Sequence, residues 1–286
     1  MEENAVVLSV VIPTYNTAEM TLRCVRAIQG ADEVIVVDDG STDDTVDRLS
    51  REARVISLEK NRGFAAAANR GVAEARGDLI LLLNSDAIVE PDALNAFVAA
   101  FENDPKLGVA GAQLLNEDGS KQWSGGRTPT LPWMIGVVSG AGHLLRRVIP
   151  KRGLESPRHT DWVSGAAMMF RREAWQPLDE RYLFYCQDID FCLNAQKAGW
   201  HVRIVDEARV THAHGSTIAP GSEMSYDPAR MWPDLLTWGR NYYGVSWASR
   251  ARIVLIAVAA LRVAWRKVRF KDATPIVRGL RALRKT

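Results

Sequence analysis

Three short and almost continuously apolar runs mark the first third of the chain. They span residues 6–12, 33–37 and 78–83 and are rich in valine, isoleucine and leucine. Runs of this length without polar alternation are typical of strands that are buried on both faces of a parallel sheet. Segments with helical periodicity separate the runs, so the pattern predicts an alternating α/β order.

The helical segments carry recognisable start signals. Apolar residues recur at helical spacing over 22–28, and Ser41 with Asp44 has the spacing of a capping box, which predicts a helix after the second strand. An alanine-rich helix is expected over 64–76, and Pro91 is expected to start another. Residues 1–100 therefore have the pattern of a nucleotide-binding α/β half.

The periodicity is weaker beyond residue 100. The pattern predicts strands at 109–115, 166–170 and 202–205, a helix at 188–198, and loops with short helices at 121–161. Long loops between ordered elements are typical of a substrate cleft. We expect one α/β domain over 1–240, made of a nucleotide-binding half (1–100) and an acceptor half (101–240), followed by a separate region, 241–286.

Composition excludes several classes of protein. The 286 residues are 47% hydrophobic and 24% charged, which is the balance of a folded protein and not of a disordered one. Cys24, Cys186 and Cys192 have no metal-ligand spacing, so we expect no zinc site and a reducing compartment, the cytosol. No secretory signal pattern opens the chain. The longest apolar run has nine residues, whereas a membrane span needs about 20, so no transmembrane helix is expected.

Two carboxylates follow the second predicted strand. Asp38 and Asp39 stand just before Gly40 and a predicted helix start, at the end of the sheet where open α/β folds bind ligands. Because an acidic pair repels phosphate, the pair is expected to accept hydrogen bonds from a nucleobase or ribose. The alternative is that both acids only stabilise the helix N-terminus.

A polar triplet, Asn84, Ser85 and Asp86, follows the third predicted strand. A carboxylate at this position can hold a divalent cation, which would neutralise a diphosphate leaving group. All three residues also favour turns, so a turn without a ligand is the alternative.

Asp188 and Asp190 lie at a predicted helix start, about 200° apart around the helix, so they cannot both face one pocket. Because the first helical turn favours an ionised carboxylate, Asp188 is expected to accept a proton readily at neutral pH. Two exposed acids at a helix start are the alternative.

His212 and His214 follow a strand-like segment and point in opposite directions if the strand continues, so they are not a chelating pair. One of them could complete a cation site begun by Asp86, since imidazole together with carboxylate suits Mn²⁺. A surface histidine without a ligand is the alternative.

Seven short sequence motifs, in a fixed order along the chain, support these site predictions. They are IPTYN at 12–16, VVDDGSTDDT at 36–45, NRGFAAAANRG at 61–71, LLLNSDAIVEPDAL at 81–94, SGAAMMFRREAW at 164–175, LDERYLFYCQDIDFC at 178–192 and VTHAHGS at 210–216. Over about 205 residues this succession resembles the family 2 inverting glycosyltransferases of the GT-A fold, and most of all their rhamnosyltransferase branch.

The resemblance implies roles for individual positions. At the nucleoside-diphosphate-sugar donor it implies Pro13, Tyr15, Asp39, Asn61, Gly63, Ser85 and Asp86. At the loop between donor sugar and acceptor it implies Trp162, Ser164, Gly165, Ala166 and Gln187. It further implies that Asp86 and His212, preferred over His214, hold Mn²⁺ or Mg²⁺, and that Asp188 is the general base.

By the same resemblance, Asp188 takes the proton of an acceptor hydroxyl while that oxygen attacks the anomeric carbon, and direct displacement inverts its configuration. The implied donor is a dTDP- or UDP-sugar, with L-rhamnose expected. The implied acceptor is a cell-surface glycan or a polyprenyl-diphosphate-linked glycan. Two positions depart from the family pattern: Gln187 replaces a glutamate, and Asn84 replaces the first acid of an Asp-x-Asp motif.

The C-terminal end differs in charge from the rest of the chain. From Arg250 onward eleven basic residues accompany one acid, Asp272, whereas the rest carries 25 basic and 33 acidic residues. Basic residues alternating with apolar ones and a tryptophan are typical of a helix on an anionic membrane. We therefore expect a peripheral protein at the cytoplasmic face of the cell membrane. Packing on its own domain or in a homodimer is the alternative, and no nucleic-acid partner is expected because no recognition motif accompanies the charge.

Two other functions are considered. A catalytically silent family member that acts as a binding or assembly subunit at the membrane is the main alternative, because Gln187 and Asn84 depart from the family pattern. A dinucleotide-dependent oxidoreductase is disfavoured, since no G-x-G-x-x-G motif follows the first strand.

Overall fold

The computed structural model describes residues 6–140, 160–213 and 226–286, which form two compact units. The described part of the first unit comprises residues 6–127, 160–180 and 187–213. That of the second comprises residues 128–140, 181–186 and 226–286. The helix at 228–243 thus groups with the C-terminal helices, while the functional boundary expected near residue 240 stays a prediction.

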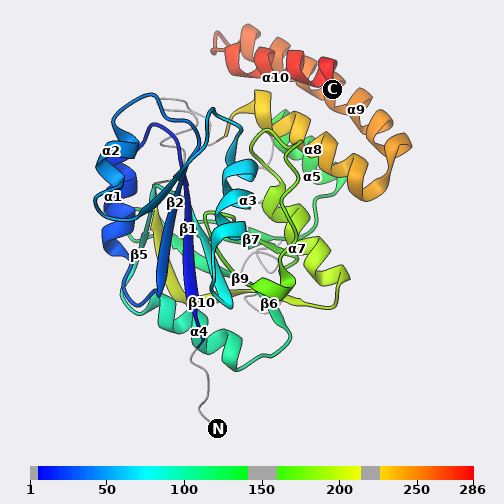
Figure 1. The fold of residues 1–286 in the computed structure, drawn as a ribbon. Helices are drawn as coiled ribbons and strands as arrows, with labels where there is room; N and C mark the ends of the chain where they lie inside the picture. Colours follow the sequence, from blue (N-terminus) through cyan, green and yellow to red (C-terminus); the bar gives the residue numbers. More distant parts are fainter. Residues whose placement is uncertain (1–5, 141–159, 214–225) are drawn as a thin grey trace. The chain divides into compact units, whose positions relative to one another are not determined.

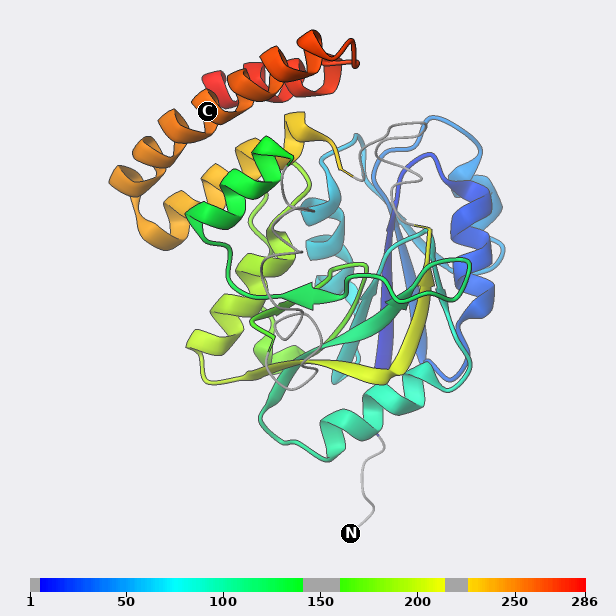
Figure 2. The same ribbon diagram turned by 180° about the vertical axis from the view of Figure 1, so that it is seen from behind.

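An eight-stranded sheet is the frame of the first unit (Figures 1 and 2). Its strands are β1 (Leu8–Thr14), β2 (Glu33–Asp38), β3 (Arg54–Ser57), β4 (Leu79–Leu83), β5 (Ala87–Val89), β6 (Leu107–Leu115), β9 (Ala167–Arg171) and β10 (His201–His212). They lie side by side in the order β3-β2-β1-β4-β9-β6-β10-β5. The pairs β1/β2, β2/β3, β1/β4 and β6/β10 are parallel, whereas β9 runs antiparallel to both of its neighbours and β5 runs antiparallel to β10. The expected α/β class with a mostly parallel sheet is confirmed.

Helices and a small ribbon complete this unit. They are α1 (Ala18–Ala27), α2 (Thr45–Leu49), α3 (Phe64–Glu74), α4 (Ala93–Glu102), α7 (Gln187–Lys197), the 3₁₀ turn η2 (Arg172–Ala174) and the antiparallel pair β7 (Gly125–Gly126) and β8 (Trp162–Val163). The strands are apolar on both faces because helices cover both, and the shared core includes Ile12, Leu81 and Phe97.

Gly71 shows how closely α3 packs on the sheet. A Cβ atom at this position would lie 2.3 Å from Cγ1 of Val11 in β1 and 2.9 Å from Cγ2 of Val37 in β2. The small side chains of α3, Ala65 to Ala68, are all buried, as the alanine-rich pattern suggests.

Local predictions at two helix starts are wrong. Ser41 and Asp44 form no capping box: the Asp44 side chain makes no cap bond, and the Ser41 N–H donates to the Asp38 carboxylate instead. Asp43 satisfies the amide of Thr45 at 3.1 Å. The fourth helix begins at Ala93 and not at Pro91, because Asp92 takes a left-handed conformation, φ 64°, as its N-cap residue.

The turn after β2 is closed by a close backbone approach. Gly40 has φ +75°, and a Cβ atom there would lie 2.6 Å from the Lys60 carbonyl carbon and 2.7 Å from the Asn61 nitrogen. The segment that carries Asn61 and Gly63 therefore rests directly on Gly40, which no other residue type permits without movement.

The described part of the second unit is helical. It contains α5 (Leu131–Ser139), α8 (Pro228–Tyr243), α9 (Val245–Val268) and α10 (Thr274–Lys285). Helices α8, α9 and α10 pack pairwise on one another, and α5 packs on α9 and α8. Among the described residues, no helix is both long enough and apolar enough to cross a bilayer.

One buried carboxylate organises a loop of this unit. Asp234 of α8 is 1% exposed, and its two oxygens accept hydrogen bonds from the amides of Leu183, Phe184 and Tyr185 at 2.7, 2.9 and 2.7 Å. Burial raises the pKa of this carboxyl, and the three amide donors act in the opposite direction.

Replacing Asp234 with Ala is expected to lower the free energy of unfolding by about 3 kcal/mol, since three partly buried amides lose their buried acceptor. Urea denaturation measures this. Asp234→Asn keeps one acceptor oxygen and should lose less. An Ala variant as stable as the wild type would contradict the anchoring role.

Gly40→Ala is expected to lower the free energy of unfolding by about 2 kcal/mol more than Gly30→Ala. Gly30 is the matched control, because it also has a positive φ, +85°, but nothing lies within 4 Å of an added Cβ. Urea denaturation of both variants isolates the clash from the backbone strain. Equal losses would show that the contact with Lys60 and Asn61 yields without cost.

Candidate active site

The carboxyl ends of β1, β2 and β4 gather the residues predicted for the donor. Thr14 at the end of β1 pairs with Asp38 at the end of β2, and β4 leads directly into Asn84, Ser85 and Asp86. The hydroxyl of Thr17 donates to that of Ser85 at 3.4 Å, which links the segment after β1 to the segment after β4. Side chains far apart in the sequence therefore meet at one end of the sheet, as predicted.

The predicted donor residues differ in how they are presented. Tyr15 is exposed, whereas Pro13 is buried within β1. Asn61 is exposed, and Gly63 is half-buried. A ligand approaching this end of the sheet can reach the side chains of Tyr15 and Asn61 most directly.

Asp39 holds the segment that carries Asn61 and Gly63. It is buried, and its two oxygens accept hydrogen bonds from the amides of Arg62 at 2.7 Å and Gly63 at 2.8 Å. Burial raises the pKa of the Asp39 carboxyl, against the effect of these two amide donors. Asp39 thus shapes the loop, while a direct contact with base or ribose stays a prediction.

Asp86 and His212 are far apart in the sequence but close together in the fold. Nε2 of His212 lies 3.3 Å from Oδ1 of Asp86 and 3.4 Å from Nδ2 of Asn84, and both side chains of the histidine–aspartate pair are less than a tenth exposed. β10 ends at His212, and its pairing with β5 aligns His212 with Ala87, next to Asp86. The predicted pair is therefore close in space.

Gln122 holds His212 by two hydrogen bonds. Its Oε1 lies 3.1 Å from Nδ1 of the imidazole, and its Nε2 donates to the His212 carbonyl oxygen at 2.6 Å. Because an amide oxygen only accepts, Nδ1 carries the proton, and in the neutral imidazole Nε2 is then the acceptor, with the Asn84 amide nitrogen at 3.4 Å and Asp86 beside it. Sequence reasoning missed Gln122, since it lies in the unpatterned segment 121–161 and its partner is far along the chain.

Within the described residues, no group of three or more His, Cys, Asp or Glu side chains has metal-ligand geometry. His214 lies outside the described residues. The donor set at hand is one carboxylate and one imidazole, with the Asn84 amide beside them. This set fits a cation that takes its remaining ligands from water and a diphosphate.

Asp188 lies in the first turn of α7, and its carboxylate faces the loop before β9. Its Oδ2 accepts the Gly165 amide at 3.0 Å, and its Oδ1 accepts the Ile189 amide at 2.8 Å. A Cβ atom at Gly165 would lie 3.4 Å from Cβ of Asp188, so the loop approaches the acid closely.

Burial governs the Asp188 carboxyl. It raises the pKa of Asp188 above the ordinary aspartate value, and the amide hydrogen bonds only partly offset this effect. The sequence-based expectation is that the helix start favours the ionised form of Asp188. Burial has the larger effect on its pKa and favours the protonated form. A carboxylate of raised pKa is a stronger base once it is ionised.

The loop from Ser164 to Ala166 joins the acid to the polar triplet. Gly165 donates to Asp188, while the carbonyl oxygen of Ala166 accepts the amide of Asn84 at 2.9 Å. Trp162 is buried, and its Nε1 donates to the Arg127 carbonyl oxygen at 3.0 Å. The predicted loop residues and the predicted base therefore belong to one continuous arrangement.

Gln187 is the buried neighbour of Asp188. Its Nε2 has no hydrogen-bond partner among the described residues. An amide donor without a partner beside the base is able to bond a ligand. The glutamate of the family pattern would offer only acceptors when ionised.

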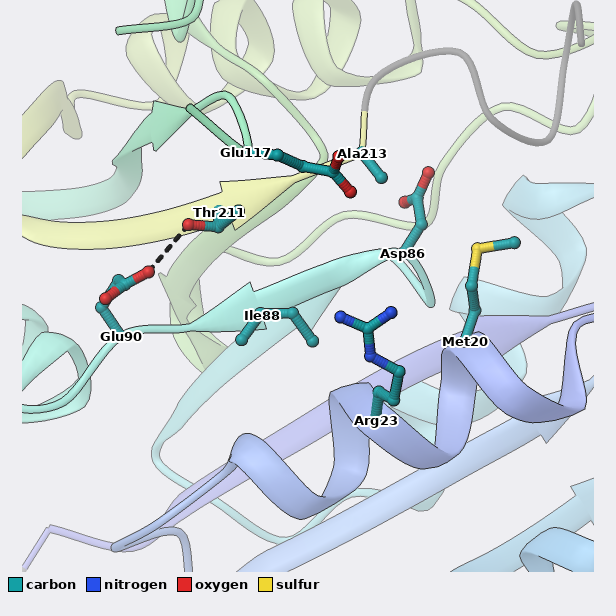
Figure 3. A pocket seen from close by; sticks show the side chains of 8 residues that line it. All are labelled: Met20, Arg23, Asp86, Ile88, Glu90, Glu117, Thr211 and Ala213. Carbon is teal, nitrogen blue, oxygen red and sulfur yellow. Dashed lines mark hydrogen bonds between the residues drawn. The ribbon is translucent and has the colours of Figure 1, made fainter. Parts of the chain in front are cut away.

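A hollow of about 320 Å³ borders Asp86 (Figure 3). Met20 and Arg23 project from α1 toward residues of β5 and β10, and Glu117 faces them from the loop after β6. The Asp86 side chain, 6% exposed, reaches open space here. Sequence reasoning also missed Arg23 and Glu117, because neither belongs to a motif.

Known proteins resemble this chain in sequence. The profile described as "Glycosyl transferase family 2" matches residues 9–178. The N-acetylglucosaminyl-diphospho-decaprenol L-rhamnosyltransferase of Mycobacterium tuberculosis (strain CDC 1551 / Oshkosh) is 28% identical over 252 residues, covering 77% of this chain and 80% of the relative.

Solved structures are similar in fold. The mannosyltransferase PcManGT from Pyrobaculum calidifontis, solved with GDP-Man and Mn²⁺, aligns with a TM-score of 0.55 at 16% identity, over 96% of this chain and 85% of the other. GalNAc-T7, solved with UDP, GalNAc and Mn²⁺, aligns with a TM-score of 0.58 at 17% identity, over 84% of this chain and 48% of the other. The fold is thus the GT-A fold, as the resemblance implied.

The profile covers more than half of the chain, and the rhamnosyltransferase relative extends the match beyond it. The chain belongs to glycosyl transferase family 2 and is similar to its rhamnosyltransferases.

Proposed function

We propose that this glycosyltransferase is an inverting hexosyltransferase that moves a sugar, L-rhamnose in our proposal, from a dTDP- or UDP-sugar to a glycan hydroxyl. The acceptor is a polyprenyl-diphosphate-linked or cell-surface glycan. One observation carries the proposal: the loop of Ser164 to Ala166 hydrogen-bonds both Asp188 and Asn84, so a base and a polar diphosphate site share one framework. The activity named for the mycobacterial relative supports the sugar and the lipid-linked acceptor.

In this proposal Asp188 is the general base. Its two amide donors fix the carboxylate in one orientation, and each oxygen retains a lone pair for an acceptor hydroxyl. The hydroxyl proton moves to Asp188 as the oxygen attacks the anomeric carbon from the side opposite the leaving diphosphate. Inversion follows because a single displacement takes place.

Asp86 and His212 are proposed to hold a divalent cation, Mn²⁺ or Mg²⁺. When bound, the cation supplies positive charge to the departing diphosphate. Gln122 fixes the imidazole tautomer that leaves Nε2 as a ligand, which is the usual task of a residue behind a metal-binding histidine. Neighbouring Tyr15, Asn61 and Gly63 line the donor side in this proposal, with Asp39 behind them.

We place the sugar transfer at the cytoplasmic face of the cell membrane in this proposal, where a polyprenyl-linked acceptor would be found. The basic composition of residues 250–286 supports this location. The alternative hypothesis is that residues 250–286 form a homodimer contact, and a change of oligomeric state would reveal it.

Asp188→Asn is expected to lower kcat by about 10²- to 10⁴-fold with donor affinity unchanged, since the amide keeps the hydrogen bond from Gly165 but cannot take a proton. Steady-state transfer assays and calorimetric donor binding measure this. Asp190→Asn is the control, because Asp190 points about 200° away around the helix. Near-normal turnover by Asp188→Asn would overturn the assignment of the base.

The same base predicts a pH dependence. Because burial raises the pKa of Asp188, the protonated and inactive form appears at a higher pH than for an ordinary aspartate. The acidic limb of the kcat profile should therefore lie above the usual aspartate range, and turnover should fall as pH decreases through it. Asp39, whose pKa is also raised, would act through KM instead.

His212→Ala is expected to abolish Mn²⁺ binding, and Gln122→Ala is expected to weaken it about 10- to 100-fold. Titration calorimetry with Mn²⁺, in the presence of a nucleoside diphosphate, measures both. His201→Ala is the matched control, since His201 forms a comparable histidine–carboxylate contact with Asp104 at 3.0 Å on the surface. Thermal stabilisation by dTDP, UDP or GDP with Mn²⁺ identifies the nucleotide. Mn²⁺ affinity unchanged in His212→Ala would contradict the site, and no response to any nucleotide would favour a silent binding subunit.

A further inference from the structure

The outward face of α9 carries large apolar side chains. Ile253, Val254, Leu261, Trp265 and Val268, which we call the α9 stripe, are 70%, 37%, 71%, 51% and 78% exposed. At 100° per residue they fall within about 120° of the helix circumference, and they extend over about 22 Å of its length. They form one continuous strip and not a scatter of single exposed residues.

The opposite side of α9 packs within its own unit and uses smaller side chains. Ala251, Leu255 and Ala259 are buried. If α9 served only to stabilise the helical unit, burying the larger apolar residues would be more favourable. The helix instead exposes them, which is the arrangement expected of a contact surface.

The basic residues of this region divide in the same way. Arg252 donates to the carbonyl oxygen of Leu283, Arg262 to those of Val137 and Val138, and Arg266 to that of Asp272. These three arginines therefore stabilise the helical unit and are engaged in it. The number of basic side chains offered to a partner is smaller than the sequence composition suggests.

Three other basic residues lie close together at the end of α9. Lys267, Arg269 and Lys271 are exposed, and the Arg269 guanidinium lies 5.1 Å from the ring centre of Trp265. Between them Phe270 is 100% exposed with φ 51°, a backbone conformation that is uncommon outside glycine. A fully exposed phenylalanine adds nothing to the packing of this unit. Together with Trp265 it forms an aromatic end flanked by cations.

We propose that the α9 stripe and Phe270 are the surface by which this protein lies in the interface of an anionic bilayer, with α9 parallel to the membrane plane. The inference rests on the proposed function, because a lipid-linked acceptor is found at such a surface. Apolar side chains beside exposed cations match the acyl boundary and the anionic headgroups of one leaflet.

Charge favours a membrane over a second copy of the chain. Across α9 and α10 the only acidic residue is Asp272, and its carboxylate accepts the Thr274 amide. Two α9 stripes placed face to face would bring lysines and arginines together without acids to pair them. An anionic leaflet supplies the missing negative charge.

The test is vesicle flotation of the full chain. Wild-type protein should float with phosphatidylcholine vesicles that contain about 30% phosphatidylglycerol, and much less with pure phosphatidylcholine. The variant Ile253→Ser/Leu261→Ser/Val268→Ser, which keeps every charge, should bind at least about tenfold more weakly. Leu183→Ser is the matched control, because Leu183 is 54% exposed in the same unit but outside the stripe, and it should bind as the wild type does.

A second measurement reports insertion directly. Leu261→Cys can be labelled with an environment-sensitive fluorophore, because the three native cysteines are buried thiols. Its emission should shift to shorter wavelength on addition of the anionic vesicles. Equal binding of the triple variant and the wild type, or an unshifted label on bound protein, would overturn the proposal in favour of attachment by charge alone.

Two further outcomes are decisive. Wild-type protein that does not float with anionic vesicles overturns the proposal. A wild-type dimer that becomes monomeric in the triple variant, by light scattering, assigns the stripe to a second copy instead. Nucleotide-dependent thermal stabilisation of the same variants reports the donor site separately, so a failed glycosyltransferase assignment and a failed membrane surface are distinguishable.

Discussion

The antiparallel insertion of β9 between β4 and β6 is the constraint on which the candidate active site depends. β4 continues into the polar triplet, and the residues just before β9 form the loop that contacts Asp188. Because β9 runs against β4, the end of one strand meets the beginning of the other, and the Asn84 amide bonds the Ala166 carbonyl oxygen. A parallel strand at this position would carry the loop to the far end of the sheet.

Buried carboxylates that accept backbone amides recur in this chain. Asp39 holds the segment at Arg62 and Gly63, Asp234 holds the loop at Leu183 to Tyr185, and Asp188 holds Gly165. In each case burial raises the pKa while the amides oppose that rise. The same physical device serves as a loop anchor at Asp39 and Asp234. At Asp188 it also produces a fixed and basic carboxylate at the candidate site.

Sequence patterns predicted the elements whose signal is local. β1, β2, β4 and α3 follow from continuous apolar runs and an alanine-rich segment, and the strand-end positions of the donor residues follow from the α/β order. The apolar pattern predicts β10 only over 202–205, whereas the strand extends from His201 to His212. Asp206 and Glu207 interrupt the apolar run, and a bulge between Val205 and Arg209 accommodates them.

Features that depend on partners far along the chain could not be predicted from local sequence patterns. Gln122 has no motif of its own, and its importance comes from His212, which β10 delivers from elsewhere in the chain. Likewise, α9 is apolar around most of its circumference, so periodicity does not tell its packed side from its exposed side. Only the packing of Ala251, Leu255 and Ala259 separates the two.

The C-terminal helices and the rest of the chain carry net charges of opposite sign. Up to residue 249 acids outnumber basic residues by 33 to 25, and beyond it the imbalance reverses to one acid and eleven basic residues. An anionic surface therefore attracts the C-terminal helices, whereas the net negative charge of residues 1–249 is repelled by it. At physiological ionic strength screening limits this attraction to about 8 Å, so charge can guide the approach but acts weakly at a distance. Retention at the surface then requires burial of apolar side chains, which is what the exposed side of α9 can supply.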